Sequence, residues 1–410
     1  MNTPKIRFKG FTDDWEQRKL GEHCVMYNGD RSSKYPNAQD MVEEGIPFIN
    51  AGDLENGHVN LAICNKISRE KYNDLGGAKL QLGDIVYCLR GTLGKNAYID
   101  NFSEGTVASS LVVIRPKNIN GRFMFHILNS DIEYRQRIVH DEGAAQPNLS
   151  AKNVAGFLIP VPHIDEQKKI SKYFDNIDHL ITLHQRKCDE TKQLKKFMLQ
   201  KMFPKNGEKN PEIRFEGFTD DWEQRKFSEL VTIERGGSPR PIDRFITKEE
   251  NGLNWIKIGD APEQGNYITK TEEKIKPEGL SKTREVHPGD LILSNSMSFG
   301  RPYILAIDGC IHDGWLAIRD TEKRFDLKFL CTLLGTDNML SQYKAMAAGS
   351  TVNNLNKELV GATTVSYPVM DEQVKLGEFF DGIDHLITLH QRKCEKLKEL
   401  KKYMLQNMFV

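Results

Sequence analysis

The chain of 410 residues is long enough for two or three domains, and its 39% hydrophobic and 28% charged residues exclude a disordered or fibrous protein. It contains no apolar run of about 18 residues and no apolar segment near its first residues, so we expect neither a membrane span nor a secretory signal. Lys+Arg and Asp+Glu number 57 each, and this neutrality argues against a protein that coats nucleic acid without specificity. Seven cysteines without a CxxC pair predict a reduced, cytoplasmic protein.

A long internal repeat dominates the sequence, and its ends are nearly identical. Residues 6–19 (IRFKGFTDDWEQRK) match residues 213–226 (IRFEGFTDDWEQRK) at 13 of 14 positions. Residues 174–188 (FDNIDHLITLHQRKC) match residues 380–394 (FDGIDHLITLHQRKC) at 14 of 15 positions. Between these ends most side chains differ, which indicates that both halves contact the same partner while each contacts a different target. Recent duplication with neutral drift is the alternative, but drift would spread the differences along the whole repeat.

Each repeat ends in a predicted long helix, over residues 165–204 and 371–410. A proline precedes each helix, and Asp165 and Asp371 suit the N-cap position. His184 and His390 occupy equivalent positions on the apolar seams, where we expect polar layers that fix the helix register. The predicted seam residues recur at heptad spacing: Ile170, Phe174, Ile177, Ile181, Leu194 and Met198 in the first helix, and Leu376, Phe380, Ile383, Ile387, Leu397, Leu400 and Met404 in the second.

The charge distribution predicts that these helices pair antiparallel. Residues 371–384 contain five acids and one lysine, whereas residues 392–402 contain six bases and two acids. The first helix has a weaker gradient of the same sense. Antiparallel pairing sets acidic starts against basic ends, although the helix dipole favours the same gradient within a single helix.

The remaining segments, residues 1–164 (head 1) and 205–370 (head 2), are predicted to be mixed α/β. Apolar runs punctuated by Gly, Pro, Asn and Asp indicate strands at Ile85–Leu89, Leu111–Arg115, Leu291–Leu293 and Trp315–Arg319. Helical stretches are expected near Phe123–Val139 and Leu327–Met346. The predicted fold class is therefore α/β (mixed α+β), with two globular domains, a long antiparallel two-helix coiled coil between them and an internal pseudo-two-fold repeat.

Several motifs resemble the DNA-specificity subunits of Type I restriction enzymes. They are the entry WEQRKL or WEQRKF to each head, the pair IPFI…GD and LNWI…GD, the run GDIVYCLRGTLGKNAYI, and the exit PVPHIDEQKKISKYFDNID with the helix end LKKFMLQKMF. The exit pattern is specific and occurs twice, and the resemblance covers the whole chain.

This resemblance implies that heads 1 and 2 are target-recognition domains, each reading one part of a split double-stranded DNA site. It also implies that the two helices set the spacer length and dock two methyltransferase subunits. S-adenosylmethionine would then bind those partners, ATP with Mg would serve a further restriction and translocation subunit, and no cofactor or metal would bind this chain.

The sequence contains no recognisable catalytic motif. The sequence lacks the Asn/Asp-Pro-Pro-aromatic loop of amino-methyltransferases and the phosphate loop G-x-x-x-x-G-K-[ST]. His179 and His184 lie five apart without a thiolate or carboxylate cluster of metal-site form. We therefore predict a non-catalytic protein without catalytic residues.

Three loops in each head are the predicted DNA-binding sites, because they recur at matching places with different side chains. A Gly/Ser/basic turn can present N–H groups and cations to phosphates, arginine pairs with guanine, and asparagine or glutamine pairs with adenine. Any single one of these residues could instead lie in an ordinary solvated turn. The candidates are Arg31, Ser32, Ser33, Lys34, Arg90, Thr92, Lys95, Asn96, Gln146 and Asn148 in head 1, and Ser238, Arg240, Asn295, Ser296, Ser298, Arg301, Asn353 and Asn354 in head 2.

Two other classes of function stay open at this point. A non-catalytic scaffold with two protein-binding heads on a helical spacer would also suit a neutral chain without a long basic run. A self-sufficient nuclease or methyltransferase is disfavoured because no catalytic motif is present. Salt-sensitive, sequence-specific DNA binding in the presence of the partner would separate the first class from a DNA reader.

Overall fold

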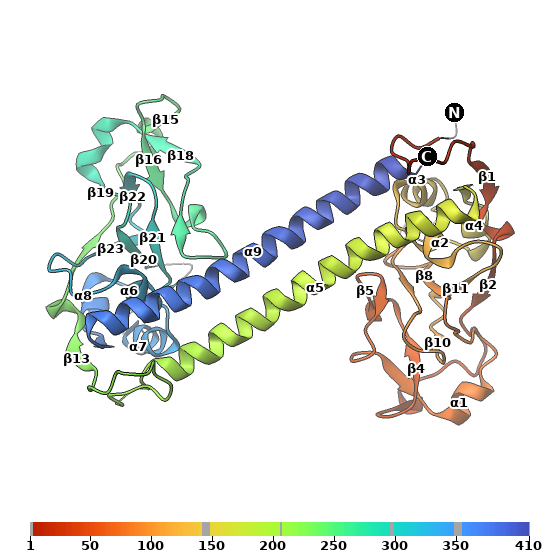
Figure 1. Cartoon of the computed structure of the whole chain (residues 1–410), viewed down its shortest axis with the longest axis horizontal. Helices are drawn as coiled ribbons and strands as arrows, with labels where there is room; N and C mark the ends of the chain where they lie inside the picture. Colours follow the sequence, from red (N-terminus) through yellow and green to blue (C-terminus); the bar gives the residue numbers. More distant parts are fainter. Residues whose placement is uncertain (1–2, 142–147, 206, 296–298, 348–354, 410) are drawn as a thin grey trace. The chain divides into compact units, whose positions relative to one another are not determined.

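The computed structural model describes residues 3–141, 148–205, 207–295, 299–347 and 355–409 (Figure 1). It forms two compact units of mixed α/β structure. Unit 1 consists of residues 1–183 with 394–410, and unit 2 consists of residues 184–393. Each unit thus combines one head with parts of both long helices. The predicted boundaries between heads and helices stay a prediction.

Unit 1 contains two four-stranded sheets, with strand orders β2-β11-β8-β9 and β10-β4-β7-β3, and the two-stranded pairs β1-β12 and β5-β6. Its strands are β1 (Glu16–Lys19), β2 (Cys24–Asn28), β3 (Met41–Val42), β4 (Ile46–Ile49), β5 (Leu54–Glu55), β6 (His58–Val59), β7 (Asn65–Ile67), β8 (Ile85–Cys88), β9 (Asn96–Tyr98), β10 (Thr106–Val107), β11 (Leu111–Pro116) and β12 (Leu158–Val161). Its short helices are α1 (Arg69–Asp74), α2 (Gly121–Ile127), α3 (Asp131–Val139) and α4 (Ala151–Ala155).

Unit 2 repeats both sheets and adds one edge strand to each, giving the orders β14-β23-β20-β21-β17 and β15-β18-β16-β22-β19, with the pair β13-β24. Its strands are β13 (Glu223–Lys226), β14 (Thr232–Arg235), β15 (Ile246–Thr247), β16 (Leu253–Ile256), β17 (Tyr267–Ile268), β18 (Glu273–Ile275), β19 (Arg284–Val286), β20 (Leu291–Ser294), β21 (Pro302–Leu305), β22 (Gly309–Ile311), β23 (Trp315–Arg319) and β24 (Thr364–Tyr367). Its short helices are α6 (Leu327–Leu334), α7 (Asp337–Ala347) and α8 (Lys357–Gly361). The internal repeat is therefore a repeat of topology.

The four predicted strands are confirmed as β8, β11, β20 and β23, each largely buried. The two predicted helical stretches are each divided into two short helices. Ser130 breaks the first stretch, because its hydroxyl accepts from the N–H of Ile132 and caps α3. Thr336 occupies the matching position and accepts from the N–H of Met339.

The two long helices, α5 (Ile164–Met202) and α9 (Met370–Met408), have 39 residues each. Both begin one residue before the predicted aspartates, which therefore lie in the first turn. Lys195 pairs with Asp384 at 2.6 Å in unit 2, and Lys401 pairs with Asp178 at 2.6 Å in unit 1. These pairs confirm the antiparallel order. No helix in the described part of the chain has an apolar stretch that could cross a membrane.

The buried seam of each helix follows heptad spacing with one correction. Leu194 and Leu400 were predicted on the seam, but they are 50% and 42% exposed. The next residues, Lys195 and Lys401, occupy the seam positions in their place. Their amines pair with Asp384 and Asp178 of the other long helix. Beyond each lysine the seam is apolar again, since Met202 and Phe203, like Met408 and Phe409, are at most 6% exposed.

The end of each long helix completes the core of the head that belongs to the other repeat. Phe203, just after α5, packs in unit 2 against Trp222, Phe329 and Phe380, with ring centroids 5.7–5.9 Å apart. In unit 1 the same arrangement surrounds Phe409, with centroids 5.7–6.3 Å from Trp15, Phe123 and Phe174. The tryptophan of each WEQRK segment therefore packs against the end of the long helix from the other half of the sequence.

A buried ion pair fastens the same entry segment to the start of a long helix in each unit. Arg214 contacts both carboxylate oxygens of Glu372 at 2.8 Å, and Arg7 contacts Glu166 at 2.7 and 2.9 Å. Each glutamate side chain is only 1% exposed. The bidentate geometry compensates the desolvation of the buried carboxylate.

The predicted histidine contact is present in unit 2, where Nδ1 of His184 lies 3.0 Å from Nδ1 of His390. Burial, His390, Lys393 and Lys187 all lower the pKa of His184 below 6.5. Folding therefore disfavours the protonated ring. The free energy of unfolding should be insensitive to this site above pH 6.5 and should fall as the pH drops below it.

Thermal unfolding of the wild type and of a His184→Asn/His390→Asn variant, followed from about pH 8 to about pH 5, would check this prediction. The difference in stability between the two proteins should be constant at neutral pH. In acid the wild type should lose stability relative to the variant. A difference that does not change with pH would contradict the assignment, because other histidines contribute equally to both proteins.

Candidate nucleic-acid interface

The three predicted loops of head 1 meet at one corner of the sheet β2-β11-β8-β9. Arg31 lies in the loop after β2 and donates to the carbonyl of Ser109 at 3.3 Å. Leu89, which opens the second loop, donates its N–H to Ser110 O at 2.9 Å and accepts from the N–H of Leu149 at 2.9 Å. The turn before β11 therefore joins residues that are far apart in the sequence.

Head 2 brings its loops together at the equivalent corner. Asn295 donates its N–H to Gly314 O at 2.9 Å, and its own carbonyl accepts from the N–H of Leu355 at 3.0 Å. The hydroxyl of Ser238 donates to Oδ1 of Asp313 at 2.9 Å. These contacts match those of Leu89, Ser110 and Leu149 in head 1, so the repeat preserves the corner while the side chains on it differ.

The exposed candidates form a polar rim at these corners. Arg90 donates to the side-chain oxygen of Asn148 at 3.2 Å and thereby links two of the loops. Lys34 forms an ion pair with Asp74. Arg240 is highly exposed, with 74% of its side chain accessible. The exposed candidates are Arg31, Ser32, Ser33, Lys34, Arg90, Thr92 and Arg240, with Asn148 and Ser238 half-buried.

A buried carboxylate shapes the first loop of head 1. Asp30 accepts from the N–H of Ser32 at 2.6 Å and from the N–H of Gly76 at 2.7 Å. The Ser32 hydroxyl, together with these N–H groups, lowers the pKa of Asp30. The loop borders a hollow of about 630 Å³ lined by residues 28–34, 74, 76 and 77. We did not predict Asp30. An aspartate after a glycine is a sequence signal for a turn in which its side chain accepts from the backbone two residues on.

Two residues that were predicted to contact bases, Asn96 and Asn295, are buried and form hydrogen bonds within the protein. Asn96 is 5% exposed, and its amide donates to the carbonyls of Gly94 and Leu128. Asn295 is 3% exposed and donates to the carbonyl of Asp313. Because these amides are buried and hydrogen-bonded, they support the loops and are not free to contact a base.

Two cations that were predicted to contact DNA, Lys95 and Arg301, donate hydrogen bonds to backbone carbonyls of neighbouring loops. Lys95 donates to the carbonyl of Ala51 at 3.0 Å, and Arg301 donates to the carbonyls of Glu263 and Gly265 at 2.9 and 3.2 Å. Both residues follow a glycine with positive φ, Gly94 or Gly300, where a β-carbon would be strained. The predicted candidates Gln146, Ser296, Ser298, Asn353 and Asn354 lie outside the described residues.

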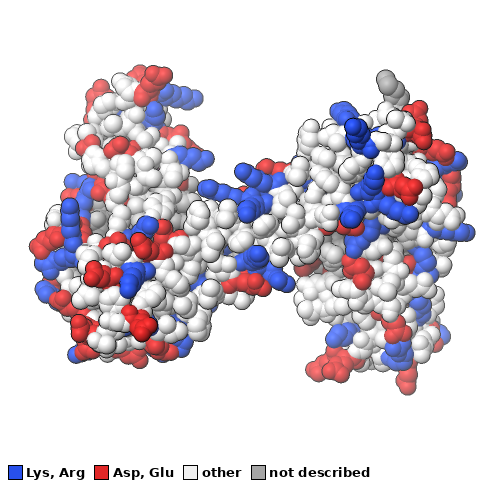
Figure 2. All heavy atoms as spheres, in the orientation of Figure 1, with Lys and Arg blue, Asp and Glu red and all other residues white. Residues whose placement is uncertain are grey.

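No group of three or more His, Cys, Asp or Glu side chains in the described part of the chain could hold a metal ion. The seven cysteines are buried and none of them forms a disulfide. Burial raises the pKa of Cys24, Cys64 and Cys331 to about 12, so their thiols stay protonated and unreactive at neutral pH. Figure 2 shows acidic and basic side chains interspersed over the visible faces, in keeping with the neutral composition.

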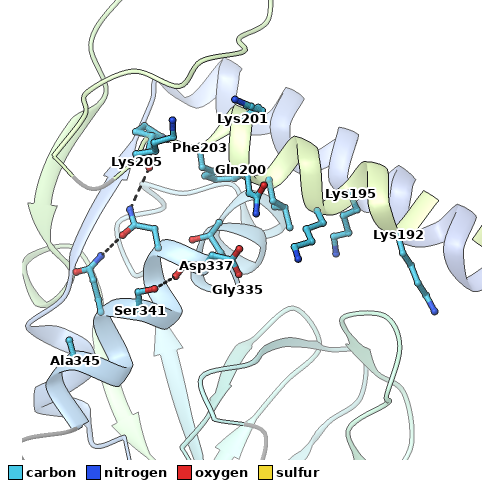
Figure 3. Close-up of a pocket in the computed structure, with 16 residues that line it drawn as sticks. Lys192, Lys195, Gln200, Lys201, Phe203, Lys205, Gly335, Asp337, Ser341 and Ala345 are labelled. Carbon is cyan, nitrogen blue, oxygen red and sulfur yellow. Dashed lines mark hydrogen bonds between the residues drawn. The ribbon is translucent and has the colours of Figure 1, made fainter. Parts of the chain in front are cut away.

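Unit 2 has a second surface feature, a groove of about 820 Å³ between the end of α5 and α7 (Figure 3). Its floor includes the apolar side chains of Leu199 and Phe203, and its rim carries several lysines. Lys192 and Lys196 on this rim make no ion pair among the described residues. Leu194 and Phe197, which are 50% and 49% exposed on α5, are not among the residues that line this groove.

Two α/β heads with converging polar loops, joined through paired long helices, define a two-headed binding protein, and the comparisons identify its family. The family model for the Type I restriction modification DNA specificity domain matches residues 12–193 and again residues 219–399. The chain therefore belongs to the Type I restriction–modification DNA specificity family. It is a DNA-recognition subunit that works in a complex and is not itself the catalyst.

Individual relatives agree with this family assignment. The Type I restriction enzyme MjaVIII specificity subunit of Methanocaldococcus jannaschii is 22% identical over 95% of this chain and 91% of its own length. The putative MjaX specificity subunit of the same organism is 21% identical, with coverages of 98% and 94%. The crystal structure of the S subunit from M. genitalium has a TM-score of 0.67 at 14% identity and covers 100% of this chain and 99% of its own. A structure from work on assembly of the type I system has a TM-score of 0.54 at 18% identity, with coverages of 95% and 96%. These matches do not favour the scaffold alternative.

Proposed function

We propose that the chain reads a bipartite DNA sequence, with head 1 binding one half-site and head 2 the other. The observation that carries this proposal is that both heads bring the described residues of the first two loops, and the residue directly after the third, to the same corner. The exposed side chains at the two corners differ. Arg31 and Arg90 in head 1 and Arg240 in head 2 are the cations best placed to contact phosphates or guanine. Since the whole chain is neutral, partners would supply much of the phosphate-binding surface.

The long helices are proposed to dock two methyltransferase subunits. Each unit exposes an equivalent set of apolar side chains on its helices. The set is Leu180, Leu400 and Tyr403 in unit 1, and Leu386, Leu194 and Phe197 in unit 2, all at least 40% exposed. Because the internal repeat makes the two sets alike, each would receive one copy of the same partner.

The chemistry would then lie entirely on partners in the cytoplasm. The methyltransferase subunits would bind S-adenosylmethionine, and a restriction subunit, where present, would use ATP with Mg. This chain would hold no cofactor, and its buried free cysteines suit a reducing compartment.

The experiment that tests the proposed function is a methylation map of DNA from cells that express this chain with its methyltransferase partner. Cells expressing the partner alone are the control. We expect modified adenine in a split motif with a fixed unspecified spacer, only when this chain is present. A stable complex that produces no new motif would overturn the assignment of the heads as readers.

The docking surface makes a prediction about stoichiometry. Leu194→Asp with Phe197→Asp should remove one partner copy, and Leu400→Asp with Tyr403→Asp should remove the other. Loss of a central aromatic anchor weakens an interface by about 2 kcal/mol or more, roughly 30-fold. Native mass spectrometry should find one methyltransferase per chain in each double variant and none in the combined variant.

A matched control for this experiment is Lys192→Ala, which changes the rim of the groove but leaves the apolar set intact. Two bound methyltransferases in every variant would contradict the docking surface. Thermal unfolding must show that each variant is folded, since the replaced side chains are exposed and should change stability by only about 0.5 kcal/mol.

A further inference from the structure

One residue that the sequence patterns did not indicate lies at the centre of the loop corner in head 2. Asp313 occupies the turn between β22 and β23. Its carbonyl accepts from Nε of Arg235 at 3.2 Å and from the amide of Asn295 at 2.9 Å. Its carboxylate accepts from the hydroxyl of Ser238 at 2.9 Å and lies 3.5 Å from Nη2 of Arg240. A single residue thus connects the first two loops of head 2.

The adjacent histidine adds a directed contact. Nδ1 of His312 accepts from the N–H of Gly314 at 3.0 Å, and Nε2 lies 2.9 Å from Oδ1 of Asp313. The ring packs against Trp255, with centroids 5.7 Å apart. Burial lowers the pKa of His312, which keeps the ring neutral at pH 7. Arg240 is therefore the cation that pairs with the Asp313 carboxylate.

The exposure of these groups indicates which of them can reach a ligand. The side chain of Asp313 is 32% exposed and that of Arg240 is 74% exposed. Nη2 of Arg240 lies 3.5 Å from Asp313, and a guanidinium carries five N–H donors, so further donors of this exposed side chain can reach a ligand. The corner therefore presents a donor and an acceptor side by side at its surface.

Head 1 lacks this arrangement. The register of the strands places Ser109 where head 2 has Asp313, and Arg31 donates to the backbone carbonyl of Ser109. Ser109 cannot supply a charged acceptor at this point. The two corners thus differ in the chemistry that they would present to a base pair.

We infer that Asp313 is a specificity-determining residue of head 2 that positions Arg240 and accepts from the target. In the major groove, a G·C pair offers the guanine acceptors O6 and N7 beside the cytosine amino donor. Arginine pairs with the former and aspartate accepts from the latter. The Arg240–Asp313 pair is complementary to such a base pair. This inference rests on the proposed function, because it assumes that head 2 reads one half-site.

The test is the methylated motif produced by complexes that contain Asp313→Asn, Asp313→Ser or Arg240→Ala, with methyltransferase partner present. We expect the half-site of head 1 to stay unchanged. In the other half-site one G·C position should become degenerate, and it should be the same position for all three variants. Binding to the wild-type site should weaken roughly 10-fold. Asp313→Glu should restore part of the discrimination because it keeps the charged carboxylate, which asparagine replaces by a neutral amide.

Ser109→Asp in head 1 is the matched control, since it should leave the half-site of head 2 unchanged. An unaltered motif in the Asp313 variants would overturn the inference. A uniform fall in methylation at an unaltered motif would also overturn it, because that result indicates a purely structural role. If the wild type itself produces no split motif, the proposed function fails and the inference about Asp313 fails with it, whereas an unaltered motif in the variants overturns the inference alone.

Discussion

Duplicating one heptad in both long helices is expected to abolish methylation at the original sites and create sites with a longer spacer. The heptad ITLHQRK occurs identically at residues 181–187 and 387–393. Duplicating both copies adds equal lengths to α5 and α9 and preserves the 3.5-residue seam. The antiparallel register would then contain two His184–His390 type contacts in place of one. Seven residues add about 10.5 Å, which corresponds to at most about 3 base pairs at 3.4 Å each.

The half-site sequences should not change, because neither head is altered. A methylation map of the double-duplication variant would show the original half-sites separated by about 2–3 additional base pairs. The control is duplication in α5 alone. It makes α5 seven residues longer than α9, so the two helices can no longer pair along their whole length, and the complex with the methyltransferase should not assemble. Altered half-site sequences, or an unchanged spacer in a fully assembled complex, would contradict the proposal that the helices set the spacing.

Phe203→Ala should strongly destabilise unit 2, although the residue belongs to the first repeat. Its ring is 5% exposed and packs among Trp222, Phe329 and Phe380. Replacing a buried phenylalanine by alanine leaves a cavity and costs about 3–5 kcal/mol. Chemical denaturation should show this loss, and Phe409→Ala should produce a similar loss in unit 1 because its surroundings are equivalent.

Phe197 provides a control on the same helix. It is 49% exposed, so Phe197→Ala should change the free energy of unfolding by only about 0.5 kcal/mol. A loss for Phe203→Ala as small as that for Phe197→Ala would show that α5 does not contribute to the core of unit 2.

The sequence by itself determined the features that depend on local order along the chain. Heptad spacing indicated the long helices, and opposite charge gradients predicted their antiparallel order, which Lys195–Asp384 and Lys401–Asp178 confirm. Alternating apolar runs indicated the central strands β8, β11, β20 and β23. The near-identical repeat ends predicted two like heads, because a repeated sequence folds into a repeated topology.

Only the tertiary structure decided which polar loop residues are free. Asn96 and Arg90 belong to the same loop, yet Asn96 is buried against Leu128 and Asn129, more than thirty residues away, while Arg90 is exposed. The partners of a buried amide come from other strands and helices, so local sequence carries no signal for them. Asp313 escaped prediction for the same reason, since its contacts with Ser238 and Asn295 form only when the strands assemble. Helix periodicity likewise could not show that Phe203 completes the head of the second repeat, because that contact depends on where the folded helix ends.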